Sequence, residues 1–251
     1  MLILLPPSER KAPGGDGPPL DLAGLSFPGL NPVRERVMDA LGEACLRDDA
    51  RDVLGLPGGQ ADDALARNRI LRQAPTLPVS RLYTGVLYEN LALGELSPEA
   101  AERANDQIIV FSGLWGALRL NDRVPPYRLA MDVTLPPEGK LAALWRPALR
   151  EALGFAEGRL IVDLRSGPYA SAWRAPAPSV PVRVFRERIL GGVPKRSVVS
   201  HMAKATRGKV ARDLLEAGVE AATPEELLKA VAGLGHTAEL NDGRLDVILH
   251  A

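Results

Sequence analysis

The chain has 251 residues, of which 46% are hydrophobic and 25% are charged, a composition typical of globular proteins. Its 31 Lys and Arg balance 31 Asp and Glu, which excludes a wholly basic nucleic-acid coat. A single cysteine excludes an internal disulfide, and no window reaches the roughly 18 apolar residues that a membrane-spanning helix needs. We expect one domain over residues 1–251 and a cytoplasmic protein without a membrane partner, because the apolar run in MLILLPPSERK is too short for a signal peptide.

Apolar runs, helix caps and turn residues divide the chain into strands and helices. In the first part of the chain, the sequence predicts a strand at residues 2–5, an irregular loop at 12–32, a helix from Asn31 and a helix over 61–71. A segment at 82–87 fits a strand or a helix, and it is followed by a helix from Pro98 with Ser97 as N-cap, a strand at 107–111 and a helix at 140–153. The last part of the chain is predicted to hold strands at 160–164 and 197–201, helices at 204–217 and 224–232, and a hairpin around Asn241, Asp242 and Gly243. Because strands and helices interleave, we expect an α/β to α+β fold with a mixed β-sheet flanked by helices.

Polar residues follow several predicted strands at the point where each strand ends. They are Ser8, Glu9, Arg10 and Lys11 after the first, Ser112 after the second, Asp163, Ser166 and Tyr169 after the third, and His201, Lys204 and Arg207 after the fourth. Ligands gather beyond the carboxyl ends of parallel strands, so we expect one polar pocket there. For residues 8–11 alone, a solvated polar loop is the alternative interpretation.

The segment FSGLWGALRLNDRVPPYRLAM, residues 111–131, combines glycines, a tryptophan and three arginines. Trp115 fits either a base-stacking side chain or a core residue, and burial is the commoner fate of a lone tryptophan. Arg119, Arg123 and Arg128 each offer a bidentate fork for phosphate or carboxylate. The arginines therefore favour an anion site in this segment.

Charge is distributed unevenly in the last third of the chain. Residues 181–212 carry nine Lys and Arg against one acid, whereas residues 213–251 are mainly acidic. A basic segment within a neutral protein indicates a local anion site. Lys204 and Arg207 lie near a predicted helix start, where the helix dipole disfavours cations, and this marks both as candidates for function.

Residues 53–71 hold the turn GLPGG between two predicted helices, a pattern that resembles a helix–hairpin–helix gripping a DNA backbone. Asp62 and Asp63 follow at once and would repel phosphate, so an ordinary helix connection is the alternative. No pair among the three histidines has metal-ligand spacing, and the chain has no Walker loop, GxGxxG or GxSxG motif. We therefore expect no metal site and no cofactor.

Five blocks of the chain resemble the YaaA family, the peroxide-stress response proteins. The blocks are MLILLPPSERK, LYTGVLYENL, FSGLWGALRLNDRVPPYRLAM, LIVDLRSGPYASAW and SHMAKATRGKVARDL, and they keep the family's order. PPSERK stands where many members have a shorter, SPAK-like stretch.

The resemblance implies an unusual mixed α/β fold that binds DNA through a positively charged cleft, with a helix–hairpin–helix element at residues 53–71. It also implies a part in keeping free intracellular iron low under hydrogen peroxide, which should be indirect because no iron ligands are evident. The cleft residues that it implies are Ser8, Lys11, Tyr83, Thr84, Trp115, Arg119, Tyr127, Arg128, Asp163, Ser166, Tyr169, Lys204 and Arg207.

Two functions remain open at this point. The first, favoured mainly by the resemblance, is a protective protein that binds double-stranded DNA with an affinity that falls steeply with salt. The second is an enzyme acting on a nucleotide, nucleobase or similar anionic small molecule, with Lys204 as base or nucleophile and Asp163 and Tyr169 as further catalytic candidates. A closed, ligand-sized pocket would favour the enzyme, and an open basic groove would favour DNA.

Overall fold

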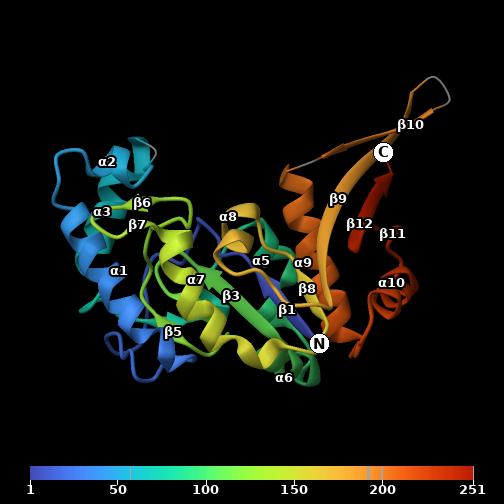
Figure 1. The fold of residues 1–251 in the computed structure, drawn as a ribbon, viewed down its shortest axis with the longest axis horizontal. Helices are drawn as coiled ribbons and strands as arrows, with labels where there is room; N and C mark the ends of the chain where they lie inside the picture. Colours follow the sequence, from blue (N-terminus) through green and yellow to red (C-terminus); the bar gives the residue numbers. More distant parts are fainter. Residues whose placement is uncertain (57, 191–192, 199, 251) are drawn as a thin grey trace.

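A mixed β-sheet of eight strands runs through the protein, with helices packed around it (Figure 1). The computed structural model describes residues 1–56, 58–190, 193–198 and 200–250. The strand order is β11-β12-β9-β8-β1-β3-β4, and β10 pairs with β9. This confirms the predicted α/β fold with a mixed sheet flanked by helices.

The centre of the sheet is parallel and buried. The strands of the large sheet are β1 (Leu2–Leu5), β3 (Ile108–Ser112), β4 (Gly116–Leu118), β8 (Ile161–Asp163), β9 (Ser179–Leu190), β10 (Val193–Val198), β11 (Ala238–Asn241) and β12 (Arg244–His250). Two small sheets pair β2 (Leu77–Pro78) with β5 (Arg123–Val124) and β6 (Thr134–Leu135) with β7 (Gly139–Lys140). β1 runs parallel to both β3 and β8, and all residues of these three strands are buried, which explains their nearly continuous apolar sequences.

Helices cover the sheet and build the region before β3. The α-helices are α1 (Asn31–Ala44), α2 (Ala50–Val53), α3 (Ala61–Arg69), α4 (Val79–Leu82), α5 (Val86–Leu91), α6 (Pro98–Gln107), α7 (Leu141–Ala152), α8 (Gly167–Ala172), α9 (Ser200–Glu216) and α10 (Pro224–Gly233), with 3-10 turns at Pro28–Leu30, Gly58–Gln60, Leu93–Glu95 and Gly154–Ala156. The Ser97 hydroxyl accepts the N–H of Ala100, which confirms the predicted N-cap of α6. Within the described residues, none of these helices combines the length and the apolar character that crossing a bilayer requires.

The predicted strand at 197–201 overlaps β10 only at residues 197 and 198, and its extension to 201 is wrong. β10 ends at Val198 and α9 begins at Ser200, so His201, Lys204 and Arg207 lie on one helix. Residues three apart on a helix share a face, and the three side chains therefore form one stripe. The structure also contains a 12-residue strand that the sequence interpretation missed, β9.

The helix–hairpin–helix element at residues 53–71 is not confirmed. The helix before the turn, α2, has only four residues, and it is followed by a 3-10 turn and α3. Pro57, within the GLPGG turn, lies outside the described residues. Asp62 and Asp63 stand in the first turn of α3, where acidic residues suit the helix dipole.

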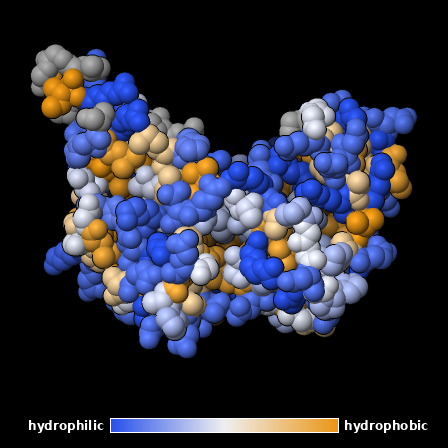
Figure 2. Space-filling model, turned by 180° about the vertical axis from the view of Figure 1, so that it is seen from behind, coloured by the Kyte–Doolittle hydropathy of each residue, from blue (hydrophilic) through white to orange (hydrophobic). Residues whose placement is uncertain are grey.

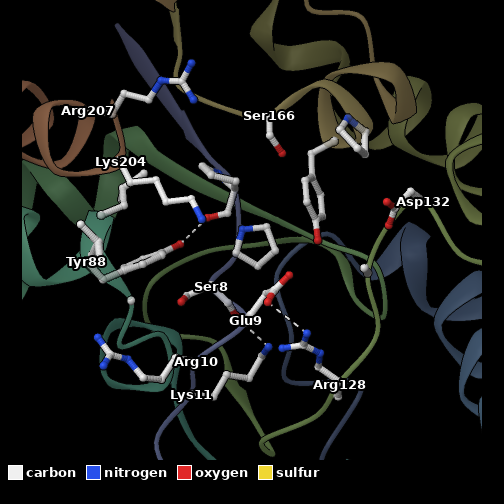
Figure 3. Close-up of a pocket in the computed structure, with 18 of the residues that line it drawn as sticks. Ser8, Glu9, Arg10, Lys11, Tyr88, Arg128, Asp132, Ser166, Lys204 and Arg207 are labelled. Carbon is white, nitrogen blue, oxygen red and sulfur yellow. Dashed lines mark hydrogen bonds and ion pairs between the residues drawn. The ribbon is translucent and has the colours of Figure 1, made fainter. Parts of the chain in front are cut away.

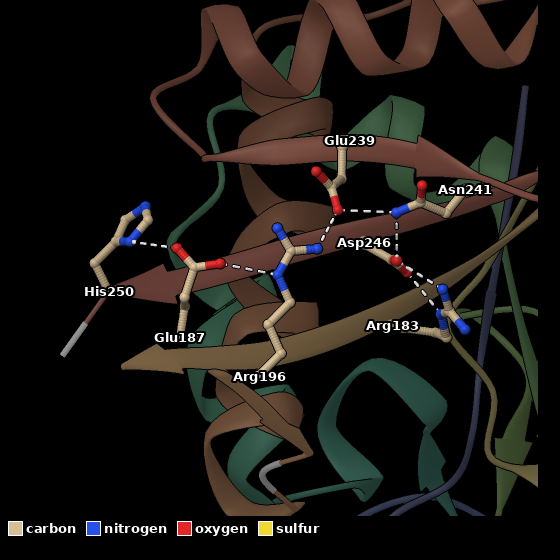
Figure 4. Close-up of polar contacts among 7 residues, drawn as sticks. All are labelled: Arg183, Glu187, Arg196, Glu239, Asn241, Asp246 and His250. Atoms are coloured by element: carbon tan, nitrogen blue, oxygen red, sulfur yellow. Dashed lines mark hydrogen bonds and ion pairs between the residues drawn. The ribbon is translucent and has the colours of Figure 1, made fainter. Parts of the chain in front are cut away.

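A polar network ties together the strands on the β11 side of the sheet (Figure 4). Its members are Arg183, Glu187, Arg196, Glu239, Asn241, Asp246 and His250. Arg183 of β9 donates two 2.6 Å hydrogen bonds to Asp246 of β12, and Arg196 of β10 pairs with acids on β9 and β11. Two of the nine cations in residues 181–212 are thus neutralised within the sheet.

Candidate functional site

The loop after β1 is fastened to the segment that precedes α5. The N–H of Thr84 donates to the carbonyl of Arg10 over 3.1 Å, and the Arg10 side chain returns a 2.9 Å bond to the carbonyl of Thr84. Gly85 allows α5 to begin against this loop, because a Cβ atom there would lie 2.1 Å from the Ser8 hydroxyl oxygen. Two segments that are some 75 positions apart in the sequence are thereby joined at the end of β1.

A pocket of about 620 Å³ opens beside this junction (Figure 3), and we call it the recess. It is lined by residues 6–11, 85–88, 128–130, 132, 166, 168, 169, 201, 204 and 207. The lining combines the loop after β1, the starts of α5 and α8, one loop before β6, and the stripe on α9. The molecule is hollowed between two lobes, and hydrophilic side chains gather along that hollow (Figure 2).

Ten of the side chains that the sequence singled out line the recess. They are Ser8, Glu9, Arg10, Lys11, Arg128, Ser166, Tyr169, His201, Lys204 and Arg207. In Figure 3, the side chains of Lys204 and Ser166 point into it from different sides. All five sequence segments that resemble the family contribute residues to the lining, the second of them through Tyr88 and its neighbours.

A buried cluster of hydroxyl groups lies behind the recess. The hydroxyls of Tyr83 and Tyr127 are 3.0 Å apart, and that of Tyr127 is 2.6 Å from the hydroxyl of Ser112. A smaller pocket of about 350 Å³ adjoins the recess and shares residues 9–11 and Arg128 with it. Tyr127 lines this smaller pocket, whereas Tyr83 and Ser112 line neither of the two. Thr84 lines neither and contributes through its backbone bonds to Arg10.

The structure does not bring Trp115 and Arg119 into the recess. Trp115 is fully buried in the core, which favours the core interpretation over base stacking. The guanidinium of Arg119 donates to the carbonyls of Asp106 and Ile108, at the amino end of β3. The recess lies at the opposite, carboxyl end of the parallel strands, so Arg119 cannot share a ligand with Arg128.

The carboxylate of Asp163 is bonded to Arg165 and does not enter the recess either. The guanidinium of Arg165 donates to both of its carboxylate oxygens, over 2.8 and 2.7 Å, and both residues are buried. Asp163 does not line the recess. Its position at the end of β8 therefore supports the sheet edge beneath the recess rather than contacting a ligand.

The cations of the recess fall into two groups. Arg128 pairs with Glu9 over 3.0 Å, and Arg10 pairs with Glu89. Lys11, Lys204 and Arg207 form no ion pair with any residue of the described chain. The Nη2 atom of Arg207 donates to the carbonyl of Val182 over 2.9 Å, while its buried Nε atom has no acceptor among the described residues. Lys204 and Arg207 are therefore available to an anionic ligand, and Lys11 joins them when its amine is protonated.

A family model described as "Peroxide stress protein YaaA" matches residues 1–239 of this chain. The chain belongs to this family. UPF0246 proteins are among its relatives: one from Streptomyces coelicolor is 45% identical over 260 residues, covering 100% of this chain and 99% of the relative. Others from Corynebacterium efficiens and Cereibacter sphaeroides are 43% and 31% identical, covering 99% and 93% of this chain and 98% and 92% of theirs.

In this member of the YaaA family, Lys11 has an unusual environment. Its Nζ atom donates to the carbonyl of Ser8 over 2.8 Å and lies 4.3 Å from the ring centroid of Tyr127. Burial and the nearby guanidinium groups of Arg128 and Arg67 lower the pKa of Lys11 to about 7, against a smaller opposing effect of Glu9.

Two polar residues that line the recess of this YaaA family member, Tyr88 and Asp132, were not among the sequence candidates. Tyr88 donates to the carbonyl of Pro6 over 2.8 Å and holds the start of the loop after β1. Asp132 lines the wall that carries Arg128. Both lie in or beside blocks that carry the family resemblance, and that position was the available signal.

The described side chains, those of the recess included, contain no group of three His, Cys, Asp or Glu arranged to hold a metal ion.

Proposed function

We propose that this YaaA family protein acts in the peroxide stress response by binding the phosphate backbone of double-stranded DNA along the recess. The proposal places this activity in the cytoplasm and expects it to accompany lower free iron and less oxidative DNA damage under peroxide. The observation that carries the proposal is the pair of recess cations without acidic partners among the described residues, Lys204 and Arg207. The buried Nε–H of Arg207 has no acceptor among the described residues, which is costly, and a phosphate oxygen would satisfy it.

The shape of the basic surface favours a chain of phosphates over a single one. A second pocket of about 350 Å³ shares residues 9–11 and Arg128 with the recess and extends to Arg67 on α3. The two pockets together form a track from Arg207 on α9 to Arg67. Such an elongated basic track fits a polyanion, which contacts proteins mainly through successive phosphates.

The proposal is tested by the salt dependence of duplex binding. A labelled duplex is titrated between about 50 and 200 mM salt against the wild type, Lys204→Met and Arg207→Met. We expect each variant to bind more weakly and to lower the slope of log affinity against log salt by about one. Lys229→Met, at an exposed position on α10, is the matched control and should bind as the wild type does. Wild-type affinity that does not change with salt would refute the proposal.

A second function is supported by the volume of the recess. A pocket of about 620 Å³ lies within the range that small ligands occupy, roughly 300–1,000 Å³. An enzyme acting on a nucleotide, a nucleobase or a similar anionic small molecule would use the same cations, with Lys204 as base or nucleophile and Tyr169 beside it on α8. Nucleoside monophosphates that raise the melting temperature of the wild type, but not of Lys204→Met, would favour this second function.

A further inference from the structure

Lys11 lines both the recess and the smaller pocket and so lies where the two meet. Its Nζ atom makes one hydrogen bond, to the carbonyl of Ser8, and lies 4.3 and 5.4 Å from the ring centroids of Tyr127 and Tyr83. The neighbouring carboxylate, that of Glu9, is bonded to Arg128 instead. Among the described residues, no acid therefore holds this amine as a fixed ammonium ion.

These surroundings favour a neutral amine. Burial removes water from the charged form, and the guanidinium groups of Arg128 and Arg67 repel it, so a large fraction of Lys11 is unprotonated near neutral pH. The faces of Tyr83 and Tyr127 attract an ammonium ion and oppose part of this effect. A lysine on the protein surface keeps a pKa near 10.4 and is almost wholly protonated at that pH.

A neutral amine amid unpaired cations has a specific chemical use. Such a lysine is a nucleophile toward carbonyl carbons, and the cations around it bind anions. Lys204 is the less suitable nucleophile because it is exposed, whereas Lys11 is partly buried and its amine lies over two aromatic rings. A ligand that matches both features carries an aldehyde and a phosphate.

We propose that Lys11 forms an imine with a phosphate-bearing aldehyde bound in the recess. The amine nitrogen attacks the aldehyde carbon and forms a C–N bond, and the carbonyl oxygen takes up protons and leaves as water. The product is a C=N bond to Nζ, and no oxidant or reductant is needed. Lys204 and Arg207 bind the phosphate, so this step rests on the anion site of the proposed function. Two sources share this chemistry: a free phosphorylated aldehyde, and the ring-opened sugar at a site in duplex DNA that has lost its base.

The experiment traps the imine with cyanoborohydride at pH 7 and locates the reduced adduct by peptide mass spectrometry. One arm uses pyridoxal 5′-phosphate, and the other uses a duplex with a single abasic position. We expect the adduct on Lys11 in the wild type and in the control Lys229→Arg, at an exposed position on α10, and none at position 11 in Lys11→Arg. Pyridoxal without phosphate should label Lys11 about tenfold less, the loss that one missing charge-assisted hydrogen bond produces.

The pattern of labelling distinguishes the two sources of the aldehyde, and one pattern would refute the proposal. Labelling in only one arm identifies that arm's aldehyde as the ligand. Labels spread over exposed lysines such as Lys229, with Lys11 unmodified in both arms, would overturn the proposal even if Lys11→Arg were unfolded. Binding of an intact duplex is measured in parallel. Its absence together with labelling of Lys11 would refute the DNA proposal and leave the imine standing.

Discussion

The hydroxyl groups of Tyr83 and Tyr127 lie 3.0 Å apart, and the amine of Lys11 lies over both rings. The Tyr127 hydroxyl also contacts that of Ser112, whose oxygen accepts two backbone N–H groups of the following turn. An oxygen that accepts two N–H groups is left with its own hydrogen to donate. The hydroxyl hydrogens therefore run from Ser112 to Tyr127 to Tyr83, and this chain fixes the rings against which Lys11 packs.

Removing the hydroxyl of Tyr127, in the middle of this chain, should lower the free energy of unfolding more than removing that of Tyr83, at its end. Tyr127→Phe leaves the Ser112 hydroxyl without its acceptor and Tyr83 without its donor, and we expect a loss of about 1–3 kcal/mol in the free energy of unfolding. Tyr83→Phe leaves one donor unpaired and should cost less. Urea denaturation of both variants measures the difference. Equal losses would contradict the middle position of Tyr127 in this chain of hydroxyl groups.

Asp163 should matter for stability more than for ligand binding. Arg165 exposes 1% of its side chain, and its guanidinium lies 4.2 Å from the ring centroid of Phe111. Asp163→Ala leaves this buried cation without its carboxylate, which typically costs about 3–5 kcal/mol. Chemical denaturation gives the loss in unfolding free energy, and duplex binding below the unfolding transition should change little.

The matched control removes both charges of this pair. The double variant Asp163→Leu with Arg165→Met leaves no unpaired cation, so it should recover most of the stability lost in the single variant. A double variant no more stable than Asp163→Ala would show that the loss arises from packing against Phe111 rather than from the unpaired guanidinium.

The sequence predicted the buried centre of the sheet because parallel strands covered on both faces need almost continuous apolar residues. Residues 2–5, 107–111 and 160–164 match β1, β3 and β8 closely. β9 was missed, although Val182 and Val184 alternate with polar residues. Pro181 argues against a central strand, and the basic side chains of this segment indicated an anion site instead.

The composition of the site was harder to predict than the fold, because one turn changes which end of the sheet a residue reaches. Arg119 and Arg128 belong to one sequence block, but β4 returns antiparallel to β3 and carries Arg119 back to the amino end of the strand. The chain must come forward again before Arg128 reaches the recess. Gly116, with a positive φ of 73°, marks that reversal, yet sequence alone does not fix the length of the returning strand.

Acid should weaken the polar network on β9 and β12. Burial acts to raise the pKa of Asp246, but the bonds from Arg183 and Asn241 outweigh it and the pKa is lowered. A carboxyl whose folded pKa is depressed contributes stability above its unfolded pKa, near 3.9, and loses that contribution as pH falls through the folded value.

Asp246→Asn isolates this contribution. At pH 7 the variant should be about 1–2 kcal/mol less stable than the wild type, in the lower range for charged hydrogen bonds because Arg183 exposes 37% of its side chain. The difference between the two proteins should shrink steadily below about pH 4. Urea denaturation at several pH values measures it. A constant difference from pH 7 to pH 3 would contradict the assignment.

Gly208 should be essential for the placement of the α9 stripe. α9 packs on α5, and a Cβ at position 208 would lie 2.1 Å from the carbonyl oxygen of Leu87. Gly208→Ala should therefore destabilise the protein by about 1–3 kcal/mol and weaken duplex binding, because Lys204 and Arg207 move with the helix. The control is Gly42→Ala on α1, where nothing lies within 4 Å of the added atom and alanine should stabilise the helix by up to about 1 kcal/mol. Thermal melts and duplex titrations of both variants test this, and a stabilised Gly208→Ala protein with wild-type affinity would show that α9 does not depend on this close contact.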